Sequence, residues 1–380
     1  MIGALAVYLL AVGRFGQFNS EFNRDSISRS VSLQSIFAIG ELLVILTGGI
    51  DLSLGSLIAF TGMLLAWVMR HLVEGGLPAA GVLWFGAGGC LLPLAWLAPT
   101  LFARRQAGEP LLPVLRIGLG AAVVCGLALR ELARAMVRGG CDATVATLIG
   151  AGVVLAFSLG LGLLHATLVH QLRLPPFVVT LASMSVLRSA ALLLNNAVPI
   201  PIDGFPLIRF LGNGKVYLAG TPAGVTVSTL IMLLLAAAST LLLLRTPLGR
   251  RIYGLGSNEE AARLSGVNTF RVRLFVYGGC SLLGGLAGIL YAGYSAQGDP
   301  SSGTMFELNA ISAAVIGGAV LTGGRGSVIG TVLGAMLLEW ILSIINLTLS
   351  NPTLWRGTVV GAVLTLAVVI NQTRILRQRR

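Results

Sequence analysis

Ionisable side chains inside long apolar runs are the residues of this sequence best suited to chemistry. Glu41 lies in FAIGELLVIL, Asp51 in TGGIDLSLG and Glu339 in MLLEWIL. A charged group at membrane depth is costly, and residues of this kind usually line solute paths or carry protons. We therefore expect several of them to line or gate a polar path. The structural alternative is that each one caps a half-helix or bonds to a neighbouring backbone group.

Other polar residues accompany these carboxylates. Asp51 is followed by Ser53, so it can cap the next helix as an Asx residue, and this structural interpretation is favoured for Asp51. Glu307 and Asn309 open the apolar run that follows the loop QGDPSSGTMF. The candidate pathway or gating residues are Glu41, Asp51, Ser53, Asn195, Glu307, Asn309 and Glu339.

The sequence LGSNEEAARLSGVN, residues 255–268, is a polar segment in a chain whose residues are 55% hydrophobic. It predicts a single helix of about two turns that is terminated at both ends. Ser257 and Glu260 have the spacing of a capping box, in which each side chain bonds a backbone N–H group at the helix start. Gly266 stands where a left-handed residue would end the helix.

Side chains of this polar segment are suited to docking. Ala261 and Ala262 leave a face of small side chains that fits a groove. Glu259, Glu260 and Arg263 supply charge at the rim of that face. The residues alone leave two interpretations open: a helix that docks a partner, or a turn that lies on the membrane surface.

The motifs of several enzyme classes are absent from the sequence. It has no G-x-x-x-x-G-K-[ST], no H-E-x-x-H, no C-x-x-C and no G-x-S-x-G. The three histidines have no obvious nucleophile partner, and the four cysteines share no metal-like spacing. We therefore expect no catalytic residue, no metal site and no cofactor bound by this chain itself.

Composition identifies the class of protein. Only 11% of the residues are charged, against roughly 25% in soluble domains, and the mean hydropathy is +0.89. The long apolar runs do not alternate with a period of two, which argues against a transmembrane barrel. The net charge of +12 does not indicate nucleic-acid binding, because Lys215 is the only lysine and the arginines are spread over many loops. We expect an all-α polytopic membrane protein with residues 1–380 as one transmembrane domain.

Apolar segments of membrane length predict ten to twelve transmembrane helices, some of them short or interrupted by glycine, since a spanning helix needs roughly 20 apolar residues. The candidate segments lie near 1–17, 31–48, 52–70, 78–102, 112–130, 144–170, 176–195, 222–244, 274–295, 306–322, 327–349 and 356–371.

The arginines predict the topology. Basic loops are retained in the cytoplasm, which assigns the loop 246–273 and the C-terminal tail to that side, with four helices between them. The segment 196–221 then lies outside. The same count assigns the arginines of 130–138 to the outer side, against the rule. Either the region 72–143 is organised differently, or these arginines belong to an amphipathic helix at the membrane interface.

Two segments repeat one glycine pattern. TGGIDLSLGSLI at 47–58 and TGGRGSVIGTVL at 322–333 both fit T-G-G-x5-G-[ST]-[LV]-[IL]. Paired segments interrupted by glycine, one in each half of a transporter, often mark broken helices at its pathway. The alternative is chance similarity in a chain rich in glycine. Other glycines recur four residues apart and are expected to pack helices closely, in a compact bundle or at a dimer interface; they are Gly284, Gly288, Gly326, Gly330 and Gly334.

Several motifs together carry a family resemblance. EAARLSG at 260–266 resembles the E-A-A-x-x-x-G signature of ATP-binding-cassette importer permeases, and TPLGRRIYGLGSNEEAARLSGVN around it resembles sugar permeases of the ribose/xylose/galactose type. VILTGGIDLSLGSL, LPPFVVTLASMSVLR and ELNAISAAVIGGAVLTGGRGSVIGTVLGA resemble the same family. The resemblance covers about 31–70 and 145–372. Residues 72–143 depart from it and look like an insertion with two extra apolar segments.

The resemblance implies a permease subunit of the bacterial inner membrane with a cytoplasmic C-terminus, which translocates a monosaccharide, either a pentose or a hexose. It implies a permease homodimer or pseudo-dimer, a periplasmic sugar-binding protein, and a cytoplasmic ATPase subunit that binds the ATP. The loop 246–273 would then be the coupling loop. The residues that would contact the ATPase are Ser257, Asn258, Glu259, Glu260, Ala261, Ala262, Arg263 and Gly266.

Two alternatives remain at this stage. The first is an ion-coupled secondary transporter that uses the carboxylates at membrane depth. The second is a related importer of nucleosides, autoinducer-like sugars or branched-chain amino acids, because the external partner largely sets the specificity of such permeases.

Overall fold

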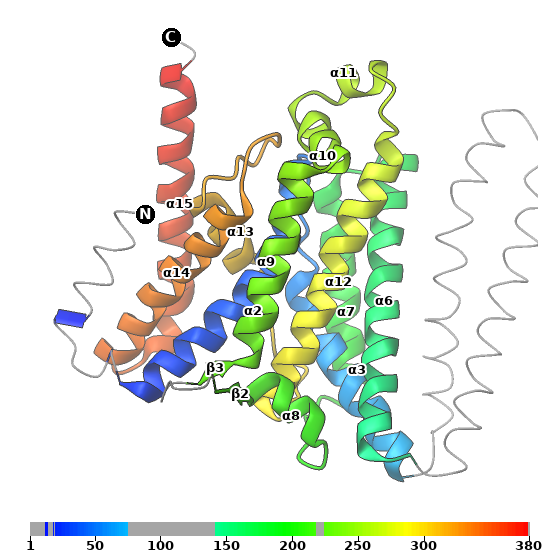
Figure 1. Ribbon diagram of the computed structural model, residues 1–380, viewed down its shortest axis with the longest axis vertical. Helices are drawn as coiled ribbons and strands as arrows, with labels where there is room; N and C mark the ends of the chain where they lie inside the picture. The colour runs from blue at the N-terminus through cyan, green and yellow to red at the C-terminus, as the bar shows by residue number, and fades with distance from the viewer. Residues whose placement is uncertain (1–11, 14–17, 19, 75–140, 218–223, 379–380) are drawn as a thin grey trace, which may run out of the picture. The chain divides into compact units, whose positions relative to one another are not determined.

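The computed structural model describes residues 12–13, 18, 20–74, 141–217 and 224–378 (Figure 1). Within this part of the chain, eight helices are long and apolar enough to cross a membrane. The predicted class, an all-α polytopic membrane protein, is therefore confirmed. The predicted segments 78–102 and 112–130 lie outside the described residues, as do most of the segment 1–17 and most of the insertion 72–143.

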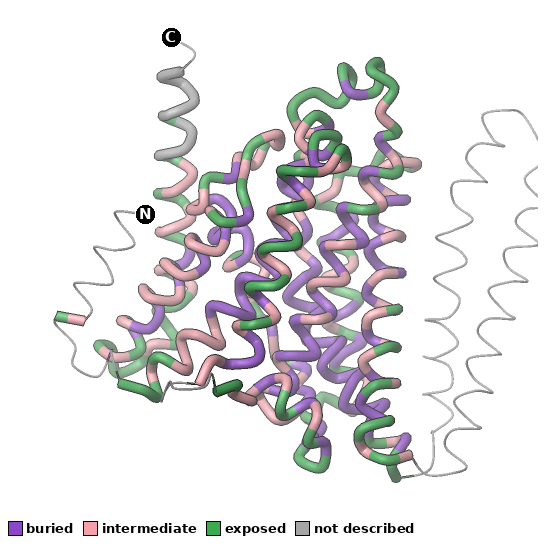
Figure 2. The backbone as a smooth tube through the Cα atoms, viewed as in Figure 1, coloured by how far each residue is buried: buried purple, intermediate pink, exposed green. Residues whose placement is uncertain are grey.

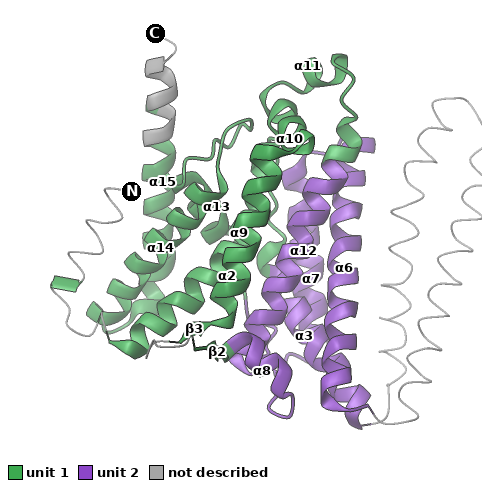
Figure 3. Cartoon of the chain, viewed as in Figure 1, with its two compact units in different colours: residues 1–55, 213–272, 303–380 green, residues 56–212, 273–302 purple. Residues whose placement is uncertain are grey.

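The chain forms two compact units, each assembled from segments far apart in the sequence (Figure 3). Unit 1 contains residues 1–55, 213–272 and 303–380, and unit 2 contains residues 56–212 and 273–302.

Unit 1 is built around α2 and α9, which run in the same direction. Near their starts, the hydroxyl oxygens of Ser28 and Thr229 are 2.8 Å apart. The elements of unit 1 are α2 (Glu21–Leu46), β2 (Lys215–Val216), β3 (Val225–Thr226), α9 (Val227–Arg245), α10 (Pro247–Ser257), α11 (Glu259–Leu264), α13 (Phe306–Ile316), α14 (Val328–Thr348) and α15 (Pro352–Gln378).

Helix α2 forms the core of unit 1. Its start is capped by Ser20, whose hydroxyl accepts from the N–H of Asn23 at 3.3 Å. Every residue from Val31 to Leu46 is buried (Figure 2), including the polar residues Gln34 and Glu41. The helix ends at a tight turn in which Gly48 has a φ of +77°, a conformation that favours glycine.

Helix α13 corrects the prediction of a span over 306–322. It has 11 residues, about 16 Å of helix, and is too short to cross a membrane. It begins beside the middle of α2, where the rings of Phe306 and Phe37 are stacked with centroids 5.6 Å apart. The chain then reaches the end of α2, since Gly324 donates a backbone hydrogen bond to Leu46. This half-length helix fits the expectation of broken helices.

Unit 2 relies on close glycine packing. A Cβ at Gly285 would collide with the Ser158 side chain of α6, and one at Gly288 would collide with the Thr61 side chain of α3. Gly284, the predicted packing residue, is buried as well. The elements that lie wholly or mainly in unit 2 are α3 (Leu54–Glu74), α6 (Ala143–Gln171), α7 (Pro176–Leu193), β1 (Ile200–Pro201), α8 (Pro206–Asn213), α12 (Thr269–Ser295) and β4 (Gln297–Gly298), with β1 antiparallel to β4.

Candidate functional site

Helix α10 begins directly after α9 because Thr246 is extended and Pro247 fits the first turn of a helix. The Thr246 hydroxyl caps this start by accepting from the N–H of Gly249 at 3.2 Å. The helix is amphipathic: Ile252 and Leu255 are buried, whereas its arginines are exposed. Residues 247–257 therefore form a helix with one apolar face and one charged face.

The polar segment is not a single helix, and the predicted capping box is wrong. Asn258 has an extended backbone, with a φ of −161°, and separates α10 from α11. Its side-chain oxygen caps α11 by accepting from the N–H of Ala261 at 2.9 Å. Ser257 instead ends α10, with its hydroxyl donating to Tyr253. Asparagine is an equally good cap, and its position one residue later shifts the helix start.

The end of α11 is closed as the sequence predicts. Gly266 has a φ of +79°, and its N–H donates to the carbonyl of Arg263 at 3.0 Å. The next N–H, of Val267, donates to Ala262 at 3.1 Å. These two bonds form a Schellman motif. The six-residue helix is thus fixed at both ends by hydrogen bonds.

The exposed face of α11 is charged. The guanidinium of Arg263 donates to the Glu260 carboxylate at 2.7 Å, and this hydrogen bond raises the pKa of Arg263 above its ordinary value. Glu259 and Ala261 are exposed, but Ala262 is only 8% exposed. A partner that docks here would therefore contact Ala261 and the charged residues, while Ala262 packs inward.

Backbone packing ties α10 to both T-G-G repeats. A Cβ at Gly256 would collide with the carbonyl oxygen of Leu46 and with the N–H of Gly324. A Cβ at Gly323 would lie only 2.9 Å from the Gly48 nitrogen and from the Gly256 oxygen. The two repeats, which are far apart in the sequence, are thus brought together with α10 in unit 1. We call Leu46, Gly48, Gly256, Gly323 and Gly324 the T-G-G junction.

A side chain reinforces the T-G-G junction. The Tyr253 hydroxyl of α10 donates to the carbonyl of Gly326 at 2.9 Å, and burial raises the pKa of this tyrosine. Gly326 itself lies close to Leu42, since a Cβ would come within 2.9 Å of the leucine side chain. Helix α10 is therefore packed closely, through main-chain atoms, against the end of α2 and against the segment just before α14.

Three of the candidate pathway residues meet within unit 1. The chain folds back after α2, so the N–H of Asp51 donates to the Glu41 carboxylate at 3.1 Å. Asp51 in turn accepts from the N–H of Ser53 at 2.9 Å and from its hydroxyl at 2.6 Å. All three residues are fully buried. The Asx bond just before α3 has the geometry that the structural interpretation of Asp51 requires.

The other candidates are arranged differently. Glu307 lies against the start of α3, since a Cβ at Gly55 would collide with its carboxylate. Asn309 and Glu339 are half-buried on α13 and α14. Asn195 belongs to unit 2, where its amide donates to the carbonyl of Val198 at 2.9 Å in the turn after α7.

The candidate packing glycines of α14 lie against α13. A Cβ at Gly330 would collide with the carbonyl of Gly317, and one at Gly334 with the carbonyl of Ala313. Small residues at this spacing let helix backbones approach closely where lipid supplies no hydrophobic driving force.

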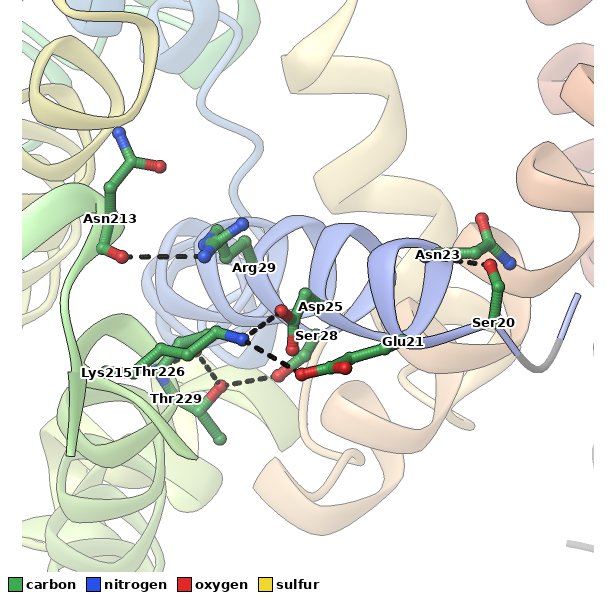
Figure 4. A network of polar contacts seen from close by, with 10 residues as sticks. All are labelled: Ser20, Glu21, Asn23, Asp25, Ser28, Arg29, Asn213, Lys215, Thr226 and Thr229. Atoms are coloured by element: carbon green, nitrogen blue, oxygen red, sulfur yellow. Dashed lines mark hydrogen bonds and ion pairs between the residues drawn. The ribbon is translucent and has the colours of Figure 1, made fainter. Parts of the chain in front are cut away.

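A polar network at the start of α2 did not emerge from the sequence (Figure 4). Lys215 of β2 forms an ion pair with Asp25 and lies 3.8 Å from the Glu21 carboxylate. The hydrogen bond that Lys215 donates to the Asp25 carboxylate raises the pKa of Lys215. Thr229 lies within hydrogen-bond distance of the hydroxyls of Ser28, Ser32 and Thr226. The one signal in the sequence is that the only lysine lies within the segment 196–221, which the arginines predict to be outside.

Known proteins resemble the chain over most of its length. The model of a family described as "Branched-chain amino acid transport system / permease component" matches residues 23–368. The ribose import permease protein RbsC of Escherichia coli (strain K12) is 29% identical over 363 residues, covering 95% of this chain and 88% of the relative. The xylose transport system permease protein XylH of the same strain is 31% identical over 356 residues, covering 93% and 85%. The comparison with solved structures gave no match.

Proposed function

Since the chain belongs to the family of transport permeases that matches residues 23–368, we propose that it is the transmembrane subunit of an ATP-binding-cassette importer for a monosaccharide. The substrate class, a pentose or a hexose, is supported by the names of its relatives, which include ribose and xylose permeases. The chain does no covalent chemistry in this proposal. A separate cytoplasmic ATPase subunit binds and hydrolyses the ATP.

The single observation that carries this proposal is the T-G-G junction at the end of α10, the helix that leads into α11. A short helix fixed at both ends and exposed to solvent is a good contact for an ATPase. Because Gly256 of α10 lies directly against Leu46 and Gly324, movement of α10 displaces the end of α2 and the segment before α14. Helix shifts of about 1–2 Å are typical of such transitions.

The remaining partners follow from the proposed topology. The loop 246–273 and the C-terminus face the cytoplasm of a bacterial inner membrane, and the segment 196–221 faces a periplasmic sugar-binding protein. Two permease subunits form a homodimer or pseudo-dimer around the path. Within each subunit, the buried group of Glu41, Asp51 and Ser53 lies next to that path and responds when the end of α2 moves.

Charge reversal at Glu260 tests the coupling role. Glu260→Arg removes the ion pair with Arg263 and places a cation at the docking face. We expect uptake to fall about tenfold or more, a change of about 1.4 kcal/mol, with the fold intact. Glu74→Arg is the matched control, because Glu74 is also an exposed carboxylate paired with an arginine, Arg70, but lies at the end of α3. Unchanged uptake by Glu260→Arg would show that α11 is not the coupling helix.

A second candidate function is ion-coupled secondary transport. The observation that favours it is the contact between two buried acidic residues, Glu41 and Asp51, because neighbouring carboxyl groups of this kind can bind a proton or a cation. Uptake into vesicles distinguishes the two candidates. Collapse of the ion gradient with ATP maintained should leave an ATP-driven importer active and should stop a secondary transporter.

A further inference from the structure

A groove of about 560 Å³ lies between α10 and α11. One wall is the exposed face of α10, with Arg250, Arg251 and Gly254. The opposite wall carries short side chains, among them those of Asn258 and Ala261. We call this feature the α10–α11 groove. All of it belongs to unit 1.

The charge of the groove is unbalanced. Arg250 and Arg251 both line it, and no acidic residue does. Within the described residues, neither arginine belongs to an ion pair, whereas the nearby Arg263 is paired with Glu260. A guanidinium binds a carboxylate through two parallel hydrogen bonds. The groove is therefore complementary to an acidic side chain that enters from outside.

The shape of the groove favours a peptide over a lipid. The short side chains leave room for an inserted segment, and the Asn258 amide can bond to a peptide group. Pro247 and Val267 are the only larger apolar residues in the lining. At Gly254 a Cβ would meet no atom within 4 Å, so there is free space in front of this wall of the groove.

We propose that the α10–α11 groove receives an acidic side chain carried by a short segment of the ATPase subunit. This inference rests on the proposed function and adds a second contact to it. The ATPase touches α11 from outside and also binds α10 through the two arginines. Docking then exerts force on both α10 and α11, the two helices that the extended residue Asn258 joins.

Two independent variants test the groove. Arg250→Glu/Arg251→Glu reverses its charge, and Gly254→Leu fills it from a position where a Cβ meets no atom within 4 Å. The measurement is the amount of ATPase subunit that co-purifies with the full-length permease from its own membranes, at low and high salt. Each variant should retain at least about tenfold less ATPase, about 1.4 kcal/mol. Wild-type retention should fall as salt screens the contact.

Matched controls separate the groove from general effects. Arg271→Glu changes an exposed arginine of the same loop outside the groove, and Gly254→Ala adds only a methyl group. Both should retain the ATPase as wild type does. Thermal unfolding in detergent must be the same for all variants that are compared.

The other outcomes overturn the inference in distinguishable ways. If both groove variants retain the ATPase while Glu260→Arg loses it, the groove is not a contact and the coupling role of α11 stands. If wild type itself retains no ATPase, the proposed function fails and the inference fails with it. If ATPase retention is unchanged and bound anionic phospholipid is lost from the charge-reversal variant, the groove holds a lipid headgroup instead.

Discussion

The two ends of α2 are attached to the rest of unit 1 by different kinds of contact. At its end, Leu46 meets α10 and the second T-G-G repeat through main-chain atoms, with glycines where side chains would collide. At its start, the helix is attached to β2 and α9 by an ion pair and by hydroxyl groups (Figure 4). One attachment requires that side chains be absent, and the other requires particular side chains.

This difference indicates different mechanical roles. Backbone atoms in direct contact transmit a displacement without side-chain rearrangement, whereas hydroxyl and ion-pair contacts can break and re-form in another register. We infer that the T-G-G junction transmits movement from α10 to α2. The contacts at the start of α2, with β2 and α9, rearrange in response. The following predictions test this contrast, from the largest expected effect to the smallest.

Gly256→Leu should have the largest effect, because the new side chain has no space at the T-G-G junction. Overpacking of this kind costs about 1–3 kcal/mol or more. The midpoint of thermal unfolding in detergent should fall, and uptake should be lost. Gly254→Ala, two residues away on the same helix, should not lower the midpoint, because alanine favours a helix more than glycine does. Equal midpoints for the two variants would contradict a tight junction.

A pair of alanine variants separates backbone conformation from collision. Gly48 and Gly323 both have positive φ, but a Cβ at Gly48 lies at an ordinary 3.4 Å from its nearest neighbour, whereas one at Gly323 lies at 2.9 Å from two backbone atoms. Gly48→Ala should cost about 1–2 kcal/mol for the left-handed conformation alone. Gly323→Ala should cost more. The reverse order in thermal unfolding would refute the geometry of the junction.

Thr229→Val probes the hydroxyl network at the opposite end. It removes a hydroxyl that lies close to those of Ser28, Ser32 and Thr226, and a lost hydrogen bond costs about 1 kcal/mol. Thr240→Val is the control on the same helix, because the Thr240 hydroxyl only donates to its own helix, at Ala236. Unfolding midpoints should be lower for Thr229→Val than for the control. Equal midpoints would mean that the network does not stabilise the protein.

The ion pair of Lys215 should give the smallest effect, confined to alkaline pH. The pKa of Lys215 is raised in the folded protein, so folding favours the protonated amine. Its contribution is complete below the ordinary value of 10.5 and is lost as pH rises through the folded pKa. The gap in unfolding midpoint between wild type and Lys215→Met should therefore narrow above that pH. A gap that stays constant or widens would exclude this role for the ion pair.

The fold class was predictable because long apolar runs impose helices of membrane length. The predicted spans over 52–70 and 327–349 correspond to α3 and α14, whereas α2 begins ten residues before the predicted span 31–48. Contacts between distant segments were not. Nothing local distinguishes Asn258 from Ser257 as the cap, since both residue types serve equally well. Helix α13 starts where Phe306 meets Phe37, a tertiary contact, whereas it ends at the glycine pair Gly317 and Gly318, the second with a φ of +95°.

The candidate site was predictable in the same uneven way. The end of α11 at Gly266 followed from a local rule that only glycine satisfies at low cost. The repeat at 47–58 and 322–333 could be recognised in the sequence, but its contact with Gly256 could not. The only sequence signal of such close packing is a glycine, and the chain contains 50 glycines. The ion pair of Lys215 could not be predicted, because its partners lie about 190 residues earlier in the sequence.

Main-chain contact at one end of α2 and breakable side-chain contacts at the other let α2 and α9 swing together as one strut. Helix α9 has 19 residues and is about 29 Å long. A sideways shift of about 2 Å at the α10 end, within the range of known helix movements, corresponds to a rotation of the strut by only about 4°. The path could then open to one side and to the other without unwinding of either helix. A small rotation of the two helices together would be sufficient, and the position of the rotation axis would set how far each end moves.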